Sequence, residues 1–176
     1  MTASGSGAAG DVRVRTAGPA DLDAVASLHA LSQRTTYRTM LPPGGTVDID
    51  EDRSRATWRA RLASPGTRRL LLAESSTADI WGFGLITAEP PPWAALNALH
   101  VRPNLRGLGV GSALLKALLA AARGWGRTGV HLSVLAENHQ ARGFYLHHGW
   151  TLAGEGSDHV IAGHPVDTLR YTLSLH

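Results

Sequence analysis

Three glycines fall within the six residues Arg106-Gly107-Leu108-Gly109-Val110-Gly111, between an apolar strand pattern and an amphipathic helix pattern. The strand pattern covers Ala94 to Val101, and the helix pattern starts at Val110 and ends near Gly124 or Gly126. The first N–H groups of a helix lack intrahelical acceptors, and the helix dipole favours negative charge there. Glycines also let the backbone approach a phosphate closely. The turn therefore predicts a site for a phosphorylated ligand.

Other nucleotide-binding folds also place a glycine-rich turn between a strand and a helix. The phosphate loop of nucleoside triphosphatases ends in Gly-Lys-Ser or Gly-Lys-Thr, and this turn lacks that ending. The dinucleotide-binding turn needs another glycine spacing and an early position in a parallel βαβ unit, and neither condition is met. A tight turn that starts a helix without binding any ligand stays an alternative.

A second pattern, NHQARGFYLHHGW, occupies residues 138–150. Asn138 is a good N-cap for the helix that follows, and Gly149 is a typical residue at a helix end. Taken singly, Asn138 could serve only as that cap, and Tyr145 could be one more core residue of an amphipathic helix. The combination of this pattern with the glycine-rich turn is more specific than either one.

The two motifs together resemble the signatures of the GNAT superfamily, the acetyl-CoA-dependent N-acetyltransferases. The family's pyrophosphate signature is Arg or Gln, two residues, Gly, one residue, and Gly or Ala, which Arg106, Gly109 and Gly111 match. Its Asn-x-x-Ala-x-x-Phe-Tyr run, with an aromatic residue after the closing glycine, is matched over 138–150. The resemblance is specific from about Ala94 to Trp150 and extends as a looser pattern over most of the chain.

This resemblance implies that acetyl-CoA is the acyl donor and that its pyrophosphate lies on the glycine-rich turn. Tyr145 would be catalytic, because a neutral phenol beside the sulfur can protonate the departing thiolate. Along the turn, backbone groups would do most of the binding. The implied cofactor-binding residues are Leu99, His100, Val101, Arg106, Gly107, Leu108, Gly109, Val110, Gly111, Ser112, Asn138 and Tyr145.

The chain departs from the family where many members carry a glutamate that removes a proton from the acceptor amine. Counting back from Val101, Ala95 holds that position and Asn97 holds another functional one, and neither side chain can act as a base. Two catalytic candidates for the base stay open. His100 is of a type that titrates near neutral pH, although alternation along the strand could turn it away from the cleft. Glu89 lies at the end of the preceding strand.

The order of strand and helix patterns predicts a mixed α/β fold. The resemblance implies the acyl-CoA N-acyltransferase fold: a central, mostly antiparallel sheet flanked by helices, with parallel strands four and five splayed apart to admit the pantetheine arm. We expect a disordered N-terminal tail, residues 1–10, and a single domain over residues 11–176. Strands are expected at 12–16, 69–74, 80–88, 94–101, 130–135, 150–153 and 168–175, helices at 19–33, 50–62, 110–124 and 138–149, and a turn at 159–167.

Composition narrows the class of protein. The 176 residues include no cysteine, which removes disulfides, thiol nucleophiles and thiolate metal sites. The histidines lack a metal-binding spacing, so no metal is expected. A net charge of +3 with dispersed arginines argues against nucleic acid binding. Because no signal peptide or membrane span is evident, we expect a soluble, cytoplasmic protein that does not bind membranes.

These features predict an N-acetyltransferase that moves the acetyl group of acetyl-CoA to a primary amine of a small molecule, an amino acid or a peptide. Since the chain has no cysteine, the amine is expected to attack directly while both substrates are bound. A non-catalytic acyl-CoA-binding or sensing module is the alternative, favoured by Ala95 and disfavoured by Tyr145. Transfer to an oxygen nucleophile and pairing into a homodimer both stay open. Candidate walls of the acceptor site lie around His29, Tyr37, Pro90–Trp93 and His159–Asp167.

Overall fold

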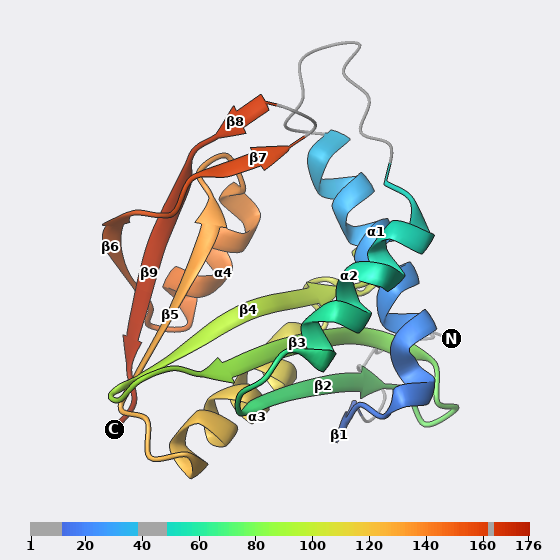
Figure 1. Ribbon diagram of the computed structural model, residues 1–176, viewed down its shortest axis with the longest axis horizontal. Helices are drawn as coiled ribbons and strands as arrows, with labels where there is room; N and C mark the ends of the chain where they lie inside the picture. Colours follow the sequence, from blue (N-terminus) through green and yellow to red (C-terminus); the bar gives the residue numbers. More distant parts are fainter. Residues whose placement is uncertain (1–11, 39–48, 162–163) are drawn as a thin grey trace, which may run out of the picture.

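The computed structural model describes residues 12–38, 49–161 and 164–176, and Figure 1 shows how they are arranged. The predicted tail, residues 1–10, lies outside the described residues. Within the described part of the chain, no helix has the length and apolar character that crossing a membrane requires.

A seven-stranded sheet forms the centre of the fold, in the order β1-β2-β3-β4-β5-β9-β6. Neighbouring strands in it are antiparallel except for β4 and β5, which are parallel. The predicted mixed α/β class, with a mostly antiparallel sheet and parallel strands four and five, is confirmed. The strands are β1 (Arg13–Thr16), β2 (Arg68–Glu74), β3 (Ile80–Ala88), β4 (Trp93–Val101), β5 (Gly129–Leu135), β6 (Thr151–Glu155), β7 (His159–Ile161), β8 (His164–Val166) and β9 (Thr168–Ser174).

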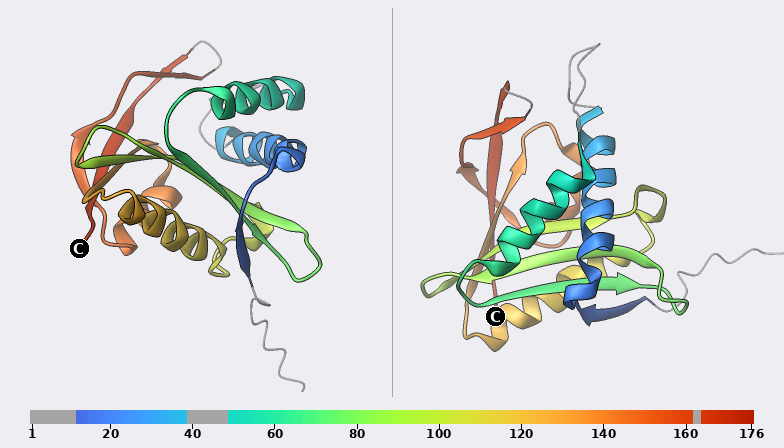
Figure 2. Two further views of the ribbon diagram at one scale, coloured as in Figure 1. Left: turned by 60° about the horizontal axis from the view of Figure 1, so that its bottom comes forward. Right: turned by 45° about the vertical axis from the view of Figure 1, so that its right-hand side comes forward.

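Helices cover both faces of the sheet, with α1 and α2 on one face and α3 on the other (Figure 2). Helix α3 can approach β3 closely because β3 carries glycines where the two elements meet. A Cβ atom added at Gly84 would lie 2.5 Å from Leu118 Cδ1, and one at Gly82 would lie 3.0 Å from Leu114 Cδ1. The helices are α1 (Leu22–Arg38), α2 (Glu51–Ala63), α3 (Val110–Gly124) and α4 (His139–His147), and single 3-10 turns lie at η1 (Pro19–Asp21) and η2 (Pro103–Leu105).

The sheet separates two apolar cores. The core beneath α3 also takes in Tyr145 of α4, Trp150 and Tyr171 of β9, so the aromatic residues of the second motif anchor α4 to the sheet. The core beneath α1 and α2 is centred on Trp58, which is fully buried, and on Phe83 of β3. Both motifs therefore pack against a densely filled core, the one beneath α3.

Most predicted elements are confirmed to within a few residues, and two predictions are wrong. Helix α1 continues to Arg38, beyond the predicted end at Gln33, and the Arg34 guanidinium donates from this extra turn to Ile49 O at 3.0 Å. The predicted turn at 159–167 instead contains the short antiparallel hairpin of β7 and β8. The β-branched residues of this segment favour extended backbone. Its single proline and single glycine instead suggested a turn, which led to the wrong prediction.

Strands β4 and β5 pair over three register positions only, of which Ala95↔His131 is the last. Beyond this point β4 stays paired with β3 as far as Val101, while β5 stays paired with β9 as far as Leu135. The two strands diverge and enclose a wedge that opens toward α4 (Figure 1). The predicted splay is thus confirmed, and we call Ala95 and His131 the vertex of the wedge.

Candidate functional site

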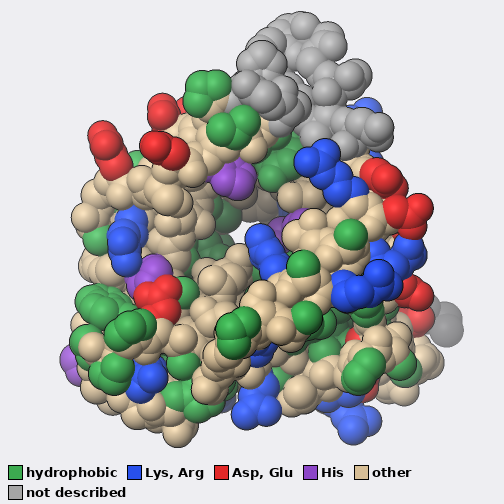
Figure 3. Space-filling view, in the orientation of Figure 1, with side chains coloured by type: hydrophobic (Ala, Val, Ile, Leu, Met, Phe, Trp, Pro, Cys, Tyr) green, Lys and Arg blue, Asp and Glu red, His purple; other side chains and the backbone are tan. Residues whose placement is uncertain are grey.

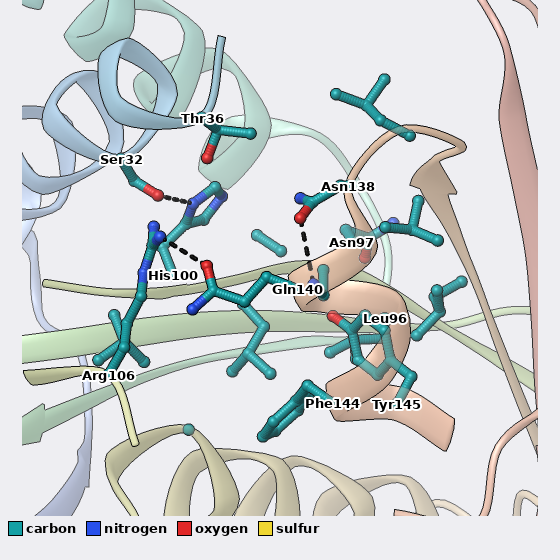
Figure 4. Close-up of a pocket in the computed structure, with 18 of the residues that line it drawn as sticks. Ser32, Thr36, Leu96, Asn97, His100, Arg106, Asn138, Gln140, Phe144 and Tyr145 are labelled. Carbon is teal, nitrogen blue, oxygen red and sulfur yellow. Dashed lines mark hydrogen bonds between the residues drawn. The ribbon is translucent and has the colours of Figure 1, made fainter. Parts of the chain in front are cut away.

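A cavity of about 630 Å³ occupies the wedge, between α1, β4, the glycine-rich turn, β5 and α4 (Figure 4). We call it the first cavity. Leu108 and Val110 do not line it, because the Leu108 side chain is exposed and that of Val110, the first residue of α3, is buried in the core. The predicted cofactor-binding residues that line it are Leu99, His100, Val101, Arg106, Gly107, Gly109, Gly111, Ser112, Asn138 and Tyr145.

The glycine-rich turn, part of which lines this cavity, has a row of backbone donors without a backbone acceptor. Gly107 and Gly109 have φ values of 80° and 85°, a left-handed conformation that strains other residues. In the described part of the chain, no backbone acceptor is found for the N–H groups from Gly107 to Ser112. A Cβ atom at Gly111 would lie 3.3 Å from Phe144 Cε2, so the two motifs touch here. Free donors at a helix start suit an anionic ligand.

Arg106 contributes a cation to the wall of the first cavity. Its Nη1 donates to Gln140 Oε1 of α4 at 2.9 Å, across the wedge (Figure 4). Burial lowers the pKa of Arg106 from its usual value, yet a guanidinium stays charged at neutral pH. No carboxylate of the described residues pairs with it. The charge is therefore available to a phosphate, and Gln140, which fills an unspecified position of the motif, was missed by sequence reasoning.

Helix α4 places Asn138 and Tyr145 on the opposite wall. Asn138 Oδ1 accepts from Ala141 N at 3.1 Å, which confirms its capping role. The Tyr145 side chain is almost fully buried, and burial raises its pKa, so the phenol keeps its proton at neutral pH. Figure 4 shows its hydroxyl directed into the cavity, and that hydroxyl forms no hydrogen bond with any described residue. Tyr145 thus offers an unused proton donor.

His100 lies on the α1 side of the cavity, half-buried against the second core. Its Nδ1 is 2.9 Å from Ser32 Oγ, and its ring stacks on Phe83 at 5.0 Å between centroids. Burial, helped by the neighbouring His29 and by positive charge, lowers the pKa of His100 to about 3. A neutral imidazole with so low a pKa is a poor proton acceptor at pH 7. Ser32 was not singled out in the sequence, because it is one serine among several in a long helix.

His29 of α1 sits beside His100, with 5.1 Å between ring centroids. Its Nδ1 is 2.8 Å from Ser54 Oγ of α2, and burial, followed by the charge of Arg61, lowers its pKa to about 4. Of the candidate acceptor walls, His29 and Tyr37 do line the first cavity. Pro90–Trp93 and the described part of 159–167 line neither this cavity nor the next one.

A second cavity, of about 600 Å³, adjoins the first on the side of α2 and the β3–β4 connection. Glu89 and Ala95 line this second cavity and not the first. Figure 3 shows an opening through the middle of the molecule, bordered by basic and histidine side chains. The two cavities meet in the wedge, where they share Arg61, Leu96, Asn97, Leu132 and Ser133.

A carboxylate and an imidazole come together in the second cavity. His131 Nε2 of β5 lies 2.8 Å from Glu89 Oε2, although the two residues are far apart in the sequence. The sequence signal for His131 was weak: it is a polar residue that alternates with apolar ones in a buried strand. Asn97 is the extra residue of a bulge on β4, because Ile86 pairs with Leu96 and Leu85 with Ala98. In the described part of the chain, no group of three or more potential ligand side chains is placed to hold a metal ion.

The fold and the two motifs agree with a known family. A model described as the acetyltransferase (GNAT) family matches residues 30–150, which span both motifs and the strands of the wedge. The chain belongs to the GNAT acetyltransferase family. The resemblance drawn from the two motifs is therefore confirmed.

Individual relatives and solved structures match most of the chain. An uncharacterized N-acetyltransferase of Mycobacterium tuberculosis is 27% identical over 152 residues, which are 84% of this chain and 94% of that protein. A GNAT acetyltransferase of Staphylococcus aureus has a TM-score of 0.75 at 16% identity, with 94% of this chain and 100% of that chain covered. The protein yncA of Salmonella typhimurium, solved with its cofactor acetyl-CoA, has a TM-score of 0.69 at 18% identity, with 94% and 95% covered. These solved structures support the same fold.

Proposed function

We propose that this GNAT protein transfers the acetyl group of acetyl-CoA to a primary amine of a small molecule, an amino acid or a peptide, with both substrates bound together. The observation that carries the proposal is the meeting of two cavities within the β4–β5 wedge. The first cavity contains Arg106 and part of the glycine-rich turn, and the second cavity contains neither. Donor and acceptor would thus meet within the wedge, each entering from its own cavity.

The residues of the first cavity fit acetyl-CoA. The free N–H groups from Gly107 to Ser112 and the Arg106 guanidinium provide donors for the pyrophosphate. Beyond Ala95, the edge of β4 that faces the wedge has no strand partner, so its backbone groups are free to bind the amides of the pantetheine arm. When bound, acetyl-CoA would supply an acetyl thioester.

Tyr145 would act as the general acid. Its hydroxyl is protonated, has no described partner and points into the first cavity, so it can give a proton to the sulfur of the leaving thiolate. Because no cysteine exists to carry the acetyl group, the acceptor nitrogen would attack directly. In this scheme Asn138 keeps the start of α4 in place and thereby orients Tyr145.

The test measures thiol release from acetyl-CoA over a panel of primary amines, amino acids and short peptides. We expect Tyr145→Phe to lower kcat by about 100-fold or more with little change in acetyl-CoA affinity, the usual size of a general-acid effect. Tyr171→Phe is a matched control, because Tyr171 is equally buried but its hydroxyl lies 3.3 Å from Arg142 Nε, away from the first cavity. Equal losses in both variants would contradict the acid role.

A non-catalytic acyl-CoA-binding module is the second candidate, and two observations favour it. Ala95 replaces the carboxylate that many GNAT members carry on β4, and His100 is a poor base because of its low pKa. Tight binding of acetyl-CoA by calorimetry without turnover on the whole panel would support this module. A failure of acetyl-CoA to bind would contradict both candidates.

A further inference from the structure

The vertex of the wedge brings a histidine to the place where β4 lacks an acidic side chain. Ala95 and His131 are direct partners in the parallel ladder, and both line the second cavity. Thr87 pairs with Ala95 from the other side and lines the same cavity, so three adjacent strands turn these residues to one face. The small Ala95 side chain leaves this face open beside the imidazole of His131.

Glu89 determines which nitrogen of the His131 ring carries the hydrogen. The Glu89 carboxylate, 2.8 Å from His131 Nε2, can only accept a hydrogen bond when ionised, so Nε2 carries the hydrogen. The other nitrogen, Nδ1, then has a free lone pair, and it has no hydrogen-bond partner among the described residues. A carboxylate that orients a neutral imidazole in this way also stabilises the imidazolium once the ring takes up a proton.

The surroundings of His131 keep its ring in place and leave it accessible. The Trp93 indole meets it edge-on, with 6.1 Å between centroids. That indole in turn lies on Gly129, where a Cβ atom would come within 2.6 Å of Trp93 Cζ3. The His131 side chain is 16% exposed and that of Glu89 is 41% exposed, so solvent and a ligand can reach the pair.

Two further charged groups face the second cavity, Arg61 of α2 and Arg68 of β2. Arg68 donates to backbone oxygens at the end of α2, including Pro65 O at 2.7 Å, and is occupied by that role. Arg61 lies over the Trp58 ring at 5.2 Å, pairs with no described carboxylate and lines both cavities. A cation where the cavities meet disfavours the ammonium form of an amine held there, which assists its deprotonation.

We propose that His131 is the general base of this enzyme and that Glu89 is its positioning residue. The proposal rests on the acetyl transfer proposed above. As the acceptor nitrogen forms its bond to the acetyl carbon and the carbon–sulfur bond breaks, His131 Nδ1 takes the proton that the nitrogen loses. Tyr145 gives its proton to the sulfur. Solvent then removes the proton from the imidazolium and restores that of the phenol, so the products are an amide and a thiol.

The kinetic test compares His131→Asn, Glu89→Gln and His139→Asn across pH 5 to 9 with the best acceptor of the amine panel. His139 is the matched control, because it is exposed and lines neither cavity. We expect His131→Asn to lower kcat by about 100-fold or more and to lose the acidic limb of the profile, at unchanged acetyl-CoA affinity. Glu89→Gln should lower kcat by a smaller factor than His131→Asn does, because an amide stabilises the imidazolium formed in the reaction less than a carboxylate does.

A second readout needs no turnover. Long-range proton–nitrogen NMR spectra of the chain without acetyl-CoA should show His131 with its hydrogen on Nε2, and Glu89→Gln should weaken this preference. If the wild type turns over an acceptor and the His131→Asn variant keeps both the wild-type rate and the acidic limb, the base assignment is overturned. The proposed function would still stand. A His131 ring that carries its hydrogen on Nδ1 would also overturn the base assignment. Absence of acetyl-CoA binding in the wild type would instead overturn the proposed function, and this assignment with it.

Discussion

Acid should destabilise this protein through two neighbouring buried histidines. His29 and His100 have their pKa values lowered to about 4 and about 3, mainly by burial, from the usual 6.5. The unfolded chain therefore binds protons on these rings at a pH where the folded chain does not. Their contribution to the free energy of unfolding is complete above pH 6.5 and is lost as the pH falls toward 4 for His29 and toward 3 for His100.

The two pKa values set the size of this loss. A histidine of this kind lowers the free energy of unfolding by up to about 1.4 kcal/mol per pH unit between its two pKa values. From pH 7 to pH 5 each ring should cost about 2 kcal/mol, and the two together at most about 4 kcal/mol. Such a loss is large against the total of about 5 to 15 kcal/mol that is typical of a folded domain.

Urea unfolding followed by circular dichroism at pH 5, 6 and 7 measures this loss. Tryptophan fluorescence is less suitable, because the ring centroids of Trp58 and His29 are 5.5 Å apart. Protonation of His29 could therefore change the fluorescence without any unfolding. We expect His29→Gln and His100→Gln each to remove about half of the pH dependence, and the double variant to remove nearly all of it. His139→Gln, which changes an exposed ring, should keep the wild-type dependence.

The pH window separates the two histidines from Asp21. The hydrogen bonds from Arg15 lower the pKa of Asp21 from its usual 3.8, so the stability that this pair contributes is lost only below that pH. A wild-type free energy of unfolding that stays flat from pH 7 to pH 5 would refute the reasoning. A double variant that falls as steeply as the wild type would also refute it.

Three substitutions test the turn, the interior of α4 and the core. Gly109→Ala should cost about 1 kcal/mol of unfolding free energy and weaken acetyl-CoA binding in calorimetry, because residue 109 has φ of 85°. Gly143→Ala, in the interior of α4 with no atom near an added Cβ, should stabilise the protein by about 0.5 to 1 kcal/mol, and equal effects of the two would contradict the strain argument. Leu114→Ala removes a fully buried side chain beneath α3 and should cost about 2 to 5 kcal/mol in urea unfolding; a loss below 1 kcal/mol would mean that this core is loosely packed.

Short-range patterns predicted the glycine-rich turn and the second motif correctly as structural elements. Helix α3 begins at Val110 and α4 is capped by Asn138, as predicted. Both starts depend on residues within one helical turn, namely Gly109 in its left-handed conformation and the Asn138 side chain. Such local preferences are readable from the sequence because the interacting groups are close along the chain.

The hairpin of β7 and β8 and the far end of α1 could not be predicted in the same way. The hairpin is built from strands of three residues each, too short for an alternating pattern to be recognised. The last turn of α1 contains two threonines, which disfavour helix, and it is held by the contact of Arg34 with Ile49 O. In both segments, pairing with a neighbour in space outweighed the weak local preference.

Residues at fixed spacing were enough to predict the family, and they also show that alanine stands at position 95, where many members carry a glutamate. Tertiary structure alone decided which basic groups are available. It buried His100 against Phe83, and it brought His131 within 2.8 Å of Glu89 across 42 residues of chain. The register of β4 and β5 and the place where they diverge set these contacts, and register depends on the packing of the whole sheet.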